Sequence, residues 1–284
     1  MIQIGRTDST KAFNEDSFGT TKTAAFVLDG ASSLVEPADP HIQNPVHHFV
    51  TWWTDYLTEA LDDESCSIRG IIETGIHAYR VAFPDAKKHA PLEAVSSTLA
   101  IVRQEQDVLH AYVLGDAEVI IANKNGNIVS VTDPAIQKND AEVLSLMAQN
   151  PNRENEIVYK GFTAEELRLL RKNRMTMNTE SGYPILSYDP KAAYRAQEIR
   201  VPVASLEDAL LLTDGLYPLY SHSTKETLIA LARTDGPDAL IKAVRRLESK
   251  DQKKEAVKRL KIHDDATALY VTGFSALAGQ ENCP

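Results

Sequence analysis

The sequence has only two cysteines among its 284 residues, Cys66 and Cys283, and they lie far apart. A disulfide scaffold needs several cysteines and a zinc ribbon needs closely spaced pairs, so both classes are excluded. Long apolar runs are also lacking, since no stretch approaches the ~20 residues that span a bilayer. The first residues show no apolar run followed by a small-residue cleavage site. We therefore expect a cytoplasmic protein that does not act at a membrane.

Positive charge is in deficit, because 30 Lys and Arg face 40 Asp and Glu, for a formal net charge of -10. Nucleic acids and anionic membranes select clustered positive charge, so the composition argues against both as the main partner. The remaining composition, 43% hydrophobic and 25% charged, is that of a soluble globular protein. An excess of acid suits a protein that gathers carboxylates around a cation.

Hydrophobic periodicity predicts helices and strands in the first half of the chain. Apolar residues at three- and four-residue spacing predict helices over residues 44–62 and 68–83. Apolar runs predict strands at residues 24–28, 99–102, 109–114, 118–122 and 127–131, the last four forming one antiparallel meander. Asn125-Gly126 is the expected turn of its last hairpin.

The second half of the chain mixes the two patterns. Residues 133–194 are polar and irregular, with helices predicted at 141–148 and 164–174; Thr163 and Glu166 form a capping box for the second. Three helical stretches are predicted between residues 225 and 261. Strands are predicted at residues 197–203, 209–213 and 267–272. Because strands near both ends of the chain should pair into shared sheets, we expect one α+β domain over residues 1–284.

Acidic residues mark the ends of four predicted strands. Three strands end near Asp29, Asp116 and Asp214, each beside a glycine, and Asp264-Asp265 precedes the last strand. Strand ends can meet at one rim of a sheet, where Mg²⁺ or Mn²⁺ takes oxygen ligands. Two carboxylates at ~4 Å repel by ~4 kcal/mol at an effective dielectric constant of 20, so such a cluster needs cations. Taken singly, each Asp-Gly pair is better explained as turn chemistry.

As an ordered set, these motifs resemble the protein phosphatase 2C family of metal-dependent Ser/Thr protein phosphatases. The resemblance covers nearly the whole chain, from about residue 11 to about residue 272, and is typical of the divergent, bacterial-type members. It implies a four-layer α-β-β-α sandwich of two antiparallel sheets flanked by helices, with residues 133–194 as a flap-like insertion. The motifs that carry it are Asn14-Glu15-Asp16, Asp29-Gly30-Ala31-Ser32, Ser97-Thr98, Gly115-Asp116, Asp214-Gly215 and Asp264-Asp265-Ala266-Thr267.

The resemblance also implies a centre of two Mn²⁺ or Mg²⁺ ions. Asp29 matches the carboxylate that bridges the two metals, and Gly30 matches the residue whose carbonyl binds the second metal. Asp214 and Asp264 match the acids that complete the first site. The family's Asp-Asn-x-Thr pattern favours Asp264 over Asp265 as the ligand.

Three further acids belong to the implied centre. Glu15 matches the acid that reaches a metal through water, Asp16 is its neighbour in the same motif, and Asp116 matches the ligand of a third, looser metal. In the implied mechanism, hydroxide bridging two cations attacks phosphorus in line with the leaving alkoxide. No covalent intermediate is needed, in agreement with the lack of a Ser-His-Asp or Cys-His pattern.

The sequence departs from the family pattern at three positions. Lys11 stands where the family carries the Arg that grips the substrate phosphate; we count Lys11 as a catalytic candidate beside Asp29, with a merely solvated lysine as the equal alternative. Ala31 replaces the His that eukaryotic members use as an acid for the leaving group. Glu118 replaces an Arg, which brings negative charge near the third-metal region.

These features favour a phosphatase that acts on phosphoserine and phosphothreonine in proteins. Two alternatives stay open, a catalytically silent signalling or binding module with the same fold and a phosphatase of small phosphoesters. The intact acids argue against the silent module, whereas Lys11 and Ala31 argue for it. The sequence indicates neither the substrate nor the oligomeric state.

Overall fold

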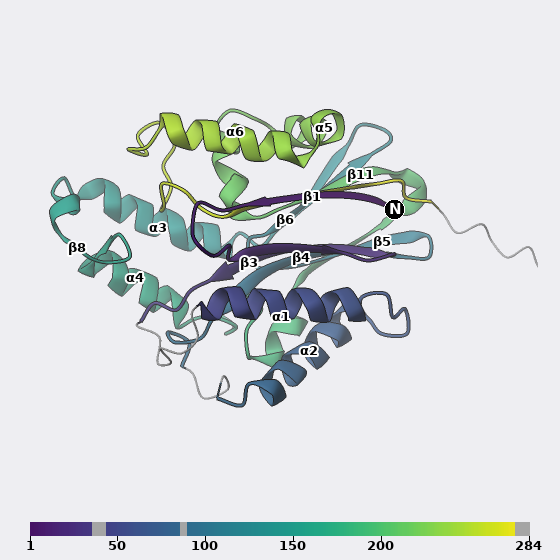
Figure 1. Cartoon of the computed structure of the whole chain (residues 1–284), viewed down its shortest axis with the longest axis horizontal. Helices are drawn as coiled ribbons and strands as arrows, with labels where there is room; N and C mark the ends of the chain where they lie inside the picture. Colours follow the sequence, from purple (N-terminus) through teal and green to yellow (C-terminus); the bar gives the residue numbers. More distant parts are fainter. Residues whose placement is uncertain (36–43, 86–89, 276–284) are drawn as a thin grey trace, which may run out of the picture.

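Two five-stranded antiparallel sheets lie face to face at the centre of the molecule, and helices cover both outer faces (Figure 1). The computed structural model describes residues 1–35, 44–85 and 90–275. Cys283 therefore lies outside the described residues. The four layers confirm the expected α-β-β-α sandwich. In the described part of the chain, no helix has the length and apolar character needed to cross a membrane.

Each sheet mixes strands from distant parts of the sequence. The first sheet has the order β1 (Ile2–Asp8), β12 (Ala266–Thr272), β11 (Leu206–Leu212), β6 (Glu118–Asn123), β7 (Ile128–Val131). The second has the order β10 (Gln197–Pro202), β5 (Val108–Leu114), β4 (Ser96–Glu105), β3 (Ala24–Ala31), β2 (Asp16–Thr20). The first strand of the chain thus pairs with the last, so segments near the two ends of the sequence lie side by side in the first sheet.

The helices form two outer layers and one projection. The second sheet is covered by α1 (Pro45–Ala60) and α2 (Ile68–Ala82), and the first by α5 (Lys225–Asp235) and α6 (Pro237–Lys250) (Figure 1). A separate group extends from one end of the sandwich (Figure 1). It consists of α3 (Ala135–Gln149), the hairpin of β8 (Ile157–Tyr159) and β9 (Phe162–Thr163), and α4 (Ala164–Arg174).

Alternation along the strands fills three separate cores. In β3, Ala25 and Val27 point into the core between the sheets, whereas Phe26 and Leu28 point into the core under α1 and α2. The side-chain period of two in a strand produces this division. A third core lies between the first sheet and α5 and α6. The near-continuous apolar character of β3 follows from burial on both faces.

Most predicted elements are confirmed, including the capping box of α4 and the hairpin that turns at Asn125-Gly126. The prediction that the four strands β4 to β7 form a single meander is wrong. β4 and β5 pair in one sheet and β6 and β7 in the other, so the chain changes sheets at Gly115-Asp116. The edge strands β1 and β2 were not predicted, because their sequences contain few apolar residues.

The prediction of a third helix before residue 261 is also wrong. The chain leaves α6 at Lys250 and forms no helix in the described residues 251–265. The Asp251 carboxylate instead accepts hydrogen bonds from the backbone N–H groups of Glu255, Ala256 and Val257. A side-chain acceptor for several backbone donors offers the chain an alternative to helical hydrogen bonds.

Candidate functional site

Antiparallel pairing brings the acidic motifs to one edge of the sandwich. Asp16 opens β2 directly opposite Asp29 in β3. In the other sheet, β11 ends where its antiparallel neighbour β12 begins, so Asp214 and Asp264 follow and precede strands at the same edge. The passage from β5 to β6 carries Asp116 to that edge, because β6 is antiparallel to β11. Residues up to 248 positions apart in sequence thus meet there (Asp16 to Asp264).

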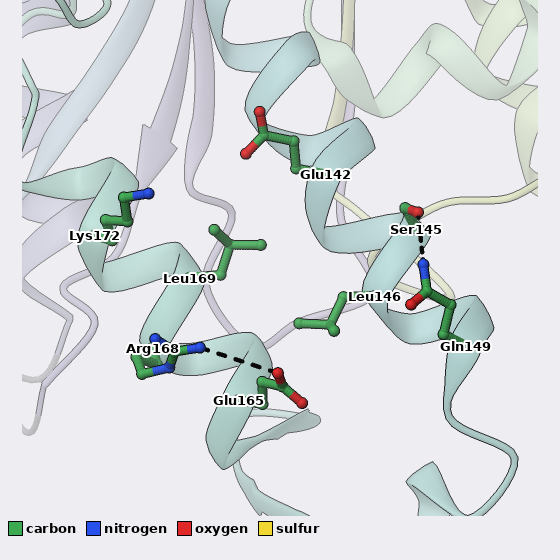
Figure 2. Close-up of a pocket in the computed structure, with 8 residues that line it drawn as sticks. All are labelled: Glu142, Ser145, Leu146, Gln149, Glu165, Arg168, Leu169 and Lys172. Atoms are coloured by element: carbon green, nitrogen blue, oxygen red, sulfur yellow. Dashed lines mark hydrogen bonds and ion pairs between the residues drawn. The ribbon is translucent and has the colours of Figure 1, made fainter.

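A pocket of about 760 Å³ opens at this edge. Six of the residues predicted to bind metal line it: Glu15, Asp29, Gly30, Asp116, Asp214 and Asp264. A second hollow, of about 460 Å³, lies between α3 and α4. Figure 2 shows that Leu146 and Leu169 face each other there, and its acids Glu142 and Glu165 are exposed. The larger pocket is the candidate functional site.

Burial and mutual repulsion raise the pKa values of the pocket acids. For Asp29, burial raises the pKa well above its ordinary value, and the charge of Asp214 adds to the shift. Burial and the charge of Asp264 raise the pKa of Asp214, although a hydrogen bond with Asp29 opposes this. Burial and Asp214 also raise the pKa of Asp116 well above its usual range. The site therefore holds several carboxylates close together, and each makes the ionised form of its neighbours less favourable.

Asp16 has one oxygen satisfied and one without a partner. Its Oδ2 accepts hydrogen bonds from the hydroxyls of Thr213 at 2.7 Å and Thr267 at 2.9 Å. Its Oδ1 is buried and has no hydrogen-bond partner in the described structure. Burial raises the pKa of Asp16 to about 8, opposed by the Thr213 hydrogen bond and supported by Asp264. A buried oxygen left in this state costs free energy unless a proton or a cation occupies it.

Two lysines stand between the acids. The Lys11 ammonium lies 2.7 Å from Glu15 Oε2 and 2.9 Å from Asp265 Oδ2. The Lys261 ammonium lies 2.8 and 2.7 Å from the two oxygens of Asp264. Burial opposes the charge of Lys261, but Asp264 and then Asp214 raise its pKa above the ordinary value. In this structure Lys11 is neither free nor simply solvated, because its charge is matched by two carboxylates.

The oxygen donors of these acids are of the kind that divalent cations bind, but in this structure the side chains are not arranged around a common point where a cation could sit. Across residues 1–35, 44–85 and 90–275, no three or more His, Cys, Asp or Glu side chains are arranged so that they could hold a metal ion. The donors are nevertheless the hard carboxylate oxygens that Mg²⁺ and Mn²⁺ select. The buried Asp16 Oδ1 and the repelling pair Asp29 and Asp214 are the observations that call for a cation. A cation at Asp264 has to displace the Lys261 ammonium.

Two glycines allow the walls of the pocket to approach each other. A Cβ on Gly30 would lie 2.3 Å from Val46 Cγ1 and 2.7 Å from the carbonyl oxygen of Glu15. A Cβ on Gly215 would lie 1.8 Å from the carbonyl oxygen of Asp265. Both distances are far below contact, so the acids beside these glycines can come together only where no side chain intervenes.

Arg174, at the end of α4, ties down the loop that follows β3. The side chain is 7% exposed. Its Nη2 donates to the carbonyl oxygens of Ala31 at 3.3 Å, Ser32 at 3.2 Å and Ala94 at 2.9 Å, and its Nε donates to that of Pro91 at 3.3 Å. One guanidinium thus serves several acceptors beside Asp29.

We expect Arg174→Met to lower the free energy of unfolding by about 3 kcal/mol, because several buried carbonyls lose their donor at once. Urea unfolding measures the change. Arg168→Met is the matched control on the same helix, since the Arg168 side chain is 81% exposed and should contribute little. Equal effects of the two substitutions would show that the Arg174 hydrogen bonds do not stabilise the loop.

Sequence reasoning missed several residues of the pocket. Asp140 of α3 lies beside the acids, and burial together with the charge of Asp214 raises its pKa to about 7. No local pattern marks Asp140, which precedes the helix predicted at 141–148. Lys261 lies three residues before Asp264 in the sequence, and this spacing was the one signal that could have pointed to it. The sequence showed no partner for the negative charge of Glu118. In the structure its carboxylate accepts hydrogen bonds from Lys225, Ser130 and Tyr220.

Comparisons with known proteins agree with this arrangement. A sequence model of the family described as Protein phosphatase 2C matches residues 6–262. No curated protein sequence matches the chain. The fold is similar to the serine/threonine phosphatase PstP/Ppp of Mycobacterium tuberculosis, with a TM-score of 0.56 and 15% identity over 95% of this chain and 97% of the other. Stp1 of Staphylococcus aureus gives a TM-score of 0.53 and 14% identity over 96% and 95% of the two chains.

Proposed function

The chain belongs to the protein phosphatase 2C family of Ser/Thr phosphatases, and on that basis we propose that it hydrolyses phosphoserine and phosphothreonine in proteins with the help of divalent metal ions. The observation that carries the proposal is the cluster of buried and half-buried carboxylates at one edge of the sandwich. Their pKa values are raised by burial and by one another. A protein without a cation to bind gains nothing from holding these charges together.

Each proposed ligand has a place in the pocket. We assign Asp29 as the carboxylate shared by two Mn²⁺ or Mg²⁺ ions, with the Gly30 carbonyl beside it. Asp214 and Asp264 complete the set on the opposite sheet. Within Asp264-Asp265 the proposal keeps Asp264, since Asp265 is 3% exposed and bonded to Ser9 Oγ at 2.5 Å, whereas Asp264 lines the pocket.

The remaining acids support this set. Glu15 lines the pocket, and Asp16 offers the unpartnered Oδ1. Asp116 lies near Asp140 and Asp214, which is the proposed place of a third ion. Two divalent cations, when bound, lower the pKa of water and stabilise negative charge on phosphoryl oxygens. The protein holds these acids on strand ends, where the sheet hydrogen bonds restrict their movement.

Residues 133–194 are proposed to act as a flap within a single phosphatase unit of residues 1–284. Residues 135–174 of this segment form the projecting group of α3, α4 and the β8–β9 hairpin (Figure 1), whereas Leu186, Ala192 and Ala193 belong to the core under α1 and α2. Lys160 of the hairpin and Asp140 of α3 both line the pocket. The projecting group therefore supplies part of the surface that a phosphoprotein would meet.

Hydrolysis of p-nitrophenyl phosphate tests the proposal. We expect turnover with Mn²⁺ or Mg²⁺, none with EDTA, and at least a hundredfold loss in Asp214→Ala, because a ligand of the reacting centre is removed. Phosphopeptides then separate a protein phosphatase from an enzyme for small phosphoesters. No turnover with either metal, together with no metal binding by calorimetry, would identify a silent module and overturn the proposal.

A further inference from the structure

Most cations of the pocket are already matched by acceptors of the protein itself. Lys261 is bonded to Asp264, Lys225 to Glu118, and Arg259 to Asp251. Outside the pocket lining, Lys11 holds Glu15 in the same way. These groups offer little positive charge to an incoming anion. A phosphatase nevertheless needs a cation for the phosphoryl group of its substrate.

Lys160 is differently placed. It lies at the tip of the β8–β9 hairpin and lines the pocket together with Glu15, Asp29 and Ser33. Its Nζ donates a long hydrogen bond, 3.3 Å, to the carbonyl oxygen of Ser33 and lies 5.5 Å from the centre of the Tyr159 ring. No ion pair of Lys160 with a carboxylate is found in the described part of the chain. The ammonium thus reaches the loop that follows Asp29 without being neutralised there.

The charges near Lys160 are those of the proposed active centre. Lys160 is an exposed residue whose partial loss of hydration lowers its pKa; the charge of Glu15 opposes this shift, and the charges of Lys261 and Lys11 add to it. The hairpin therefore brings the Lys160 ammonium close to the motif acid Glu15. Lys11, which the family pattern assigns to phosphate binding, approaches the same acid but is held by it.

The hairpin is built to hold Lys160 in one position. Lys160 and Gly161 have φ values of 47° and 82°, as the two central residues of a type I′ turn require. Arg153 Nη2 donates to the Gly161 carbonyl oxygen at 2.5 Å. The same guanidinium makes two hydrogen bonds with the buried Glu166 carboxylate, at 2.7 and 3.1 Å. Tyr159 is also tied to the loop after β3, through its hydroxyl and the Val35 carbonyl.

We propose that Lys160 is a substrate-binding residue whose ammonium contacts a phosphoryl oxygen and takes over the role that the family gives to the position of Lys11. The inference rests on the proposed phosphatase function and names one residue of its substrate site. Lys160 releases a weak carbonyl contact when an anion arrives, whereas Lys11 has to give up two carboxylates. The exchange replaces a long contact of 3.3 Å with a neutral carbonyl by a hydrogen bond in which both the ammonium and the phosphate are ionised, and this favours the exchange.

Three variants test this role. Lys160→Met removes the charge and keeps the aliphatic stem, and Lys160→Arg keeps the charge. Lys172→Met is the matched control, because Lys172 is an exposed lysine of α4 in the same projecting group and lines the second hollow rather than the pocket. Each protein is loaded with Mn²⁺, and thermal unfolding checks that it is folded. The measurements are KM and kcat for p-nitrophenyl phosphate, and inorganic phosphate binding by calorimetry.

For Lys160→Met we expect KM and the dissociation constant of inorganic phosphate to rise about tenfold, with kcat changed less than about twofold. Lys160→Arg should stay within about threefold of the wild type, and Lys172→Met should be unchanged. Equal effects in Lys160→Met and Lys172→Met would show that Lys160 acts only through the general surface charge and would overturn the inference. So would unchanged phosphate binding in Lys160→Met.

The two proposals fail in different ways. If the wild type hydrolyses p-nitrophenyl phosphate and Lys160→Met has the same KM and phosphate affinity, the phosphatase function stands and Lys160 has no role in binding. If the wild type has no turnover, the function proposal fails, and phosphate calorimetry still decides whether Lys160 binds the anion.

Discussion

Asp29→Asn is expected to lower kcat/KM for p-nitrophenyl phosphate by at least about a thousandfold and, at the same time, to stabilise the metal-free protein. The loss of activity follows because Asp29 is proposed to be shared by both metals. The gain in stability follows because the half-buried Asp29 carboxylate lies beside Asp214 and its pKa is raised well above the usual range. A neutral amide removes this repulsion, and we expect about 1 to 2 kcal/mol of added stability without metal.

The control for Asp29→Asn is another acid of the same edge, Asp265. Asp265 is 3% exposed; burial opposes its charge, but hydrogen bonds from Ser9 and from the Glu15 backbone lower its pKa. Asp265→Asn restores the residue of the family pattern and should keep most of the activity. Steady-state kinetics with Mn²⁺ and urea unfolding in EDTA measure both effects. If the two variants lose activity equally, the assignment of Asp264 rather than Asp265 as the ligand is wrong.

The metal-free protein is expected to become less stable as the pH rises from 6 to 8, by about 3 to 4 kcal/mol. In the folded protein the pKa of Asp16 is about 8 and that of Asp140 about 7, both above their ordinary value of 3.8. Within this pH range the folded protein retains protons that the unfolded chain has already released. Raising the pH therefore favours the unfolded state. Lys11 and Lys261 do not contribute, because their raised pKa values leave them charged throughout.

Urea unfolding in EDTA at pH 6, 7 and 8 measures this dependence. Asp16→Asn should reduce it by more than half, since only Asp140 of this pair then titrates in the range. Saturating Mn²⁺ should reverse it, because metal binding requires deprotonated carboxylates and becomes tighter as the pH rises. Stability that is constant with pH in EDTA, or a slope that is the same in Asp16→Asn, would contradict the electrostatic account of the cluster.

Local sequence patterns were sufficient for most helices, most strands and the acids at their ends. The spacing of Phe49, Trp53 and Leu57 specifies α1, and Thr163 with Glu166 specifies the start of α4, because these signals act within one or two turns. The ordered acidic motifs led to the family and to the pocket residues. These are properties of short segments, so the sequence by itself determined them.

Only the tertiary structure decided how the charges are balanced and which residues share the pocket. Lys11 pairs with Asp265, Glu118 with Lys225, and Lys160 reaches Ser33, all across more than 100 residues of sequence. The change of sheet at Gly115 likewise depends on which strands β5 and β6 find as neighbours. Such contacts leave no periodic signal, because the partner is chosen by packing and by the charge of distant segments rather than by the local chain.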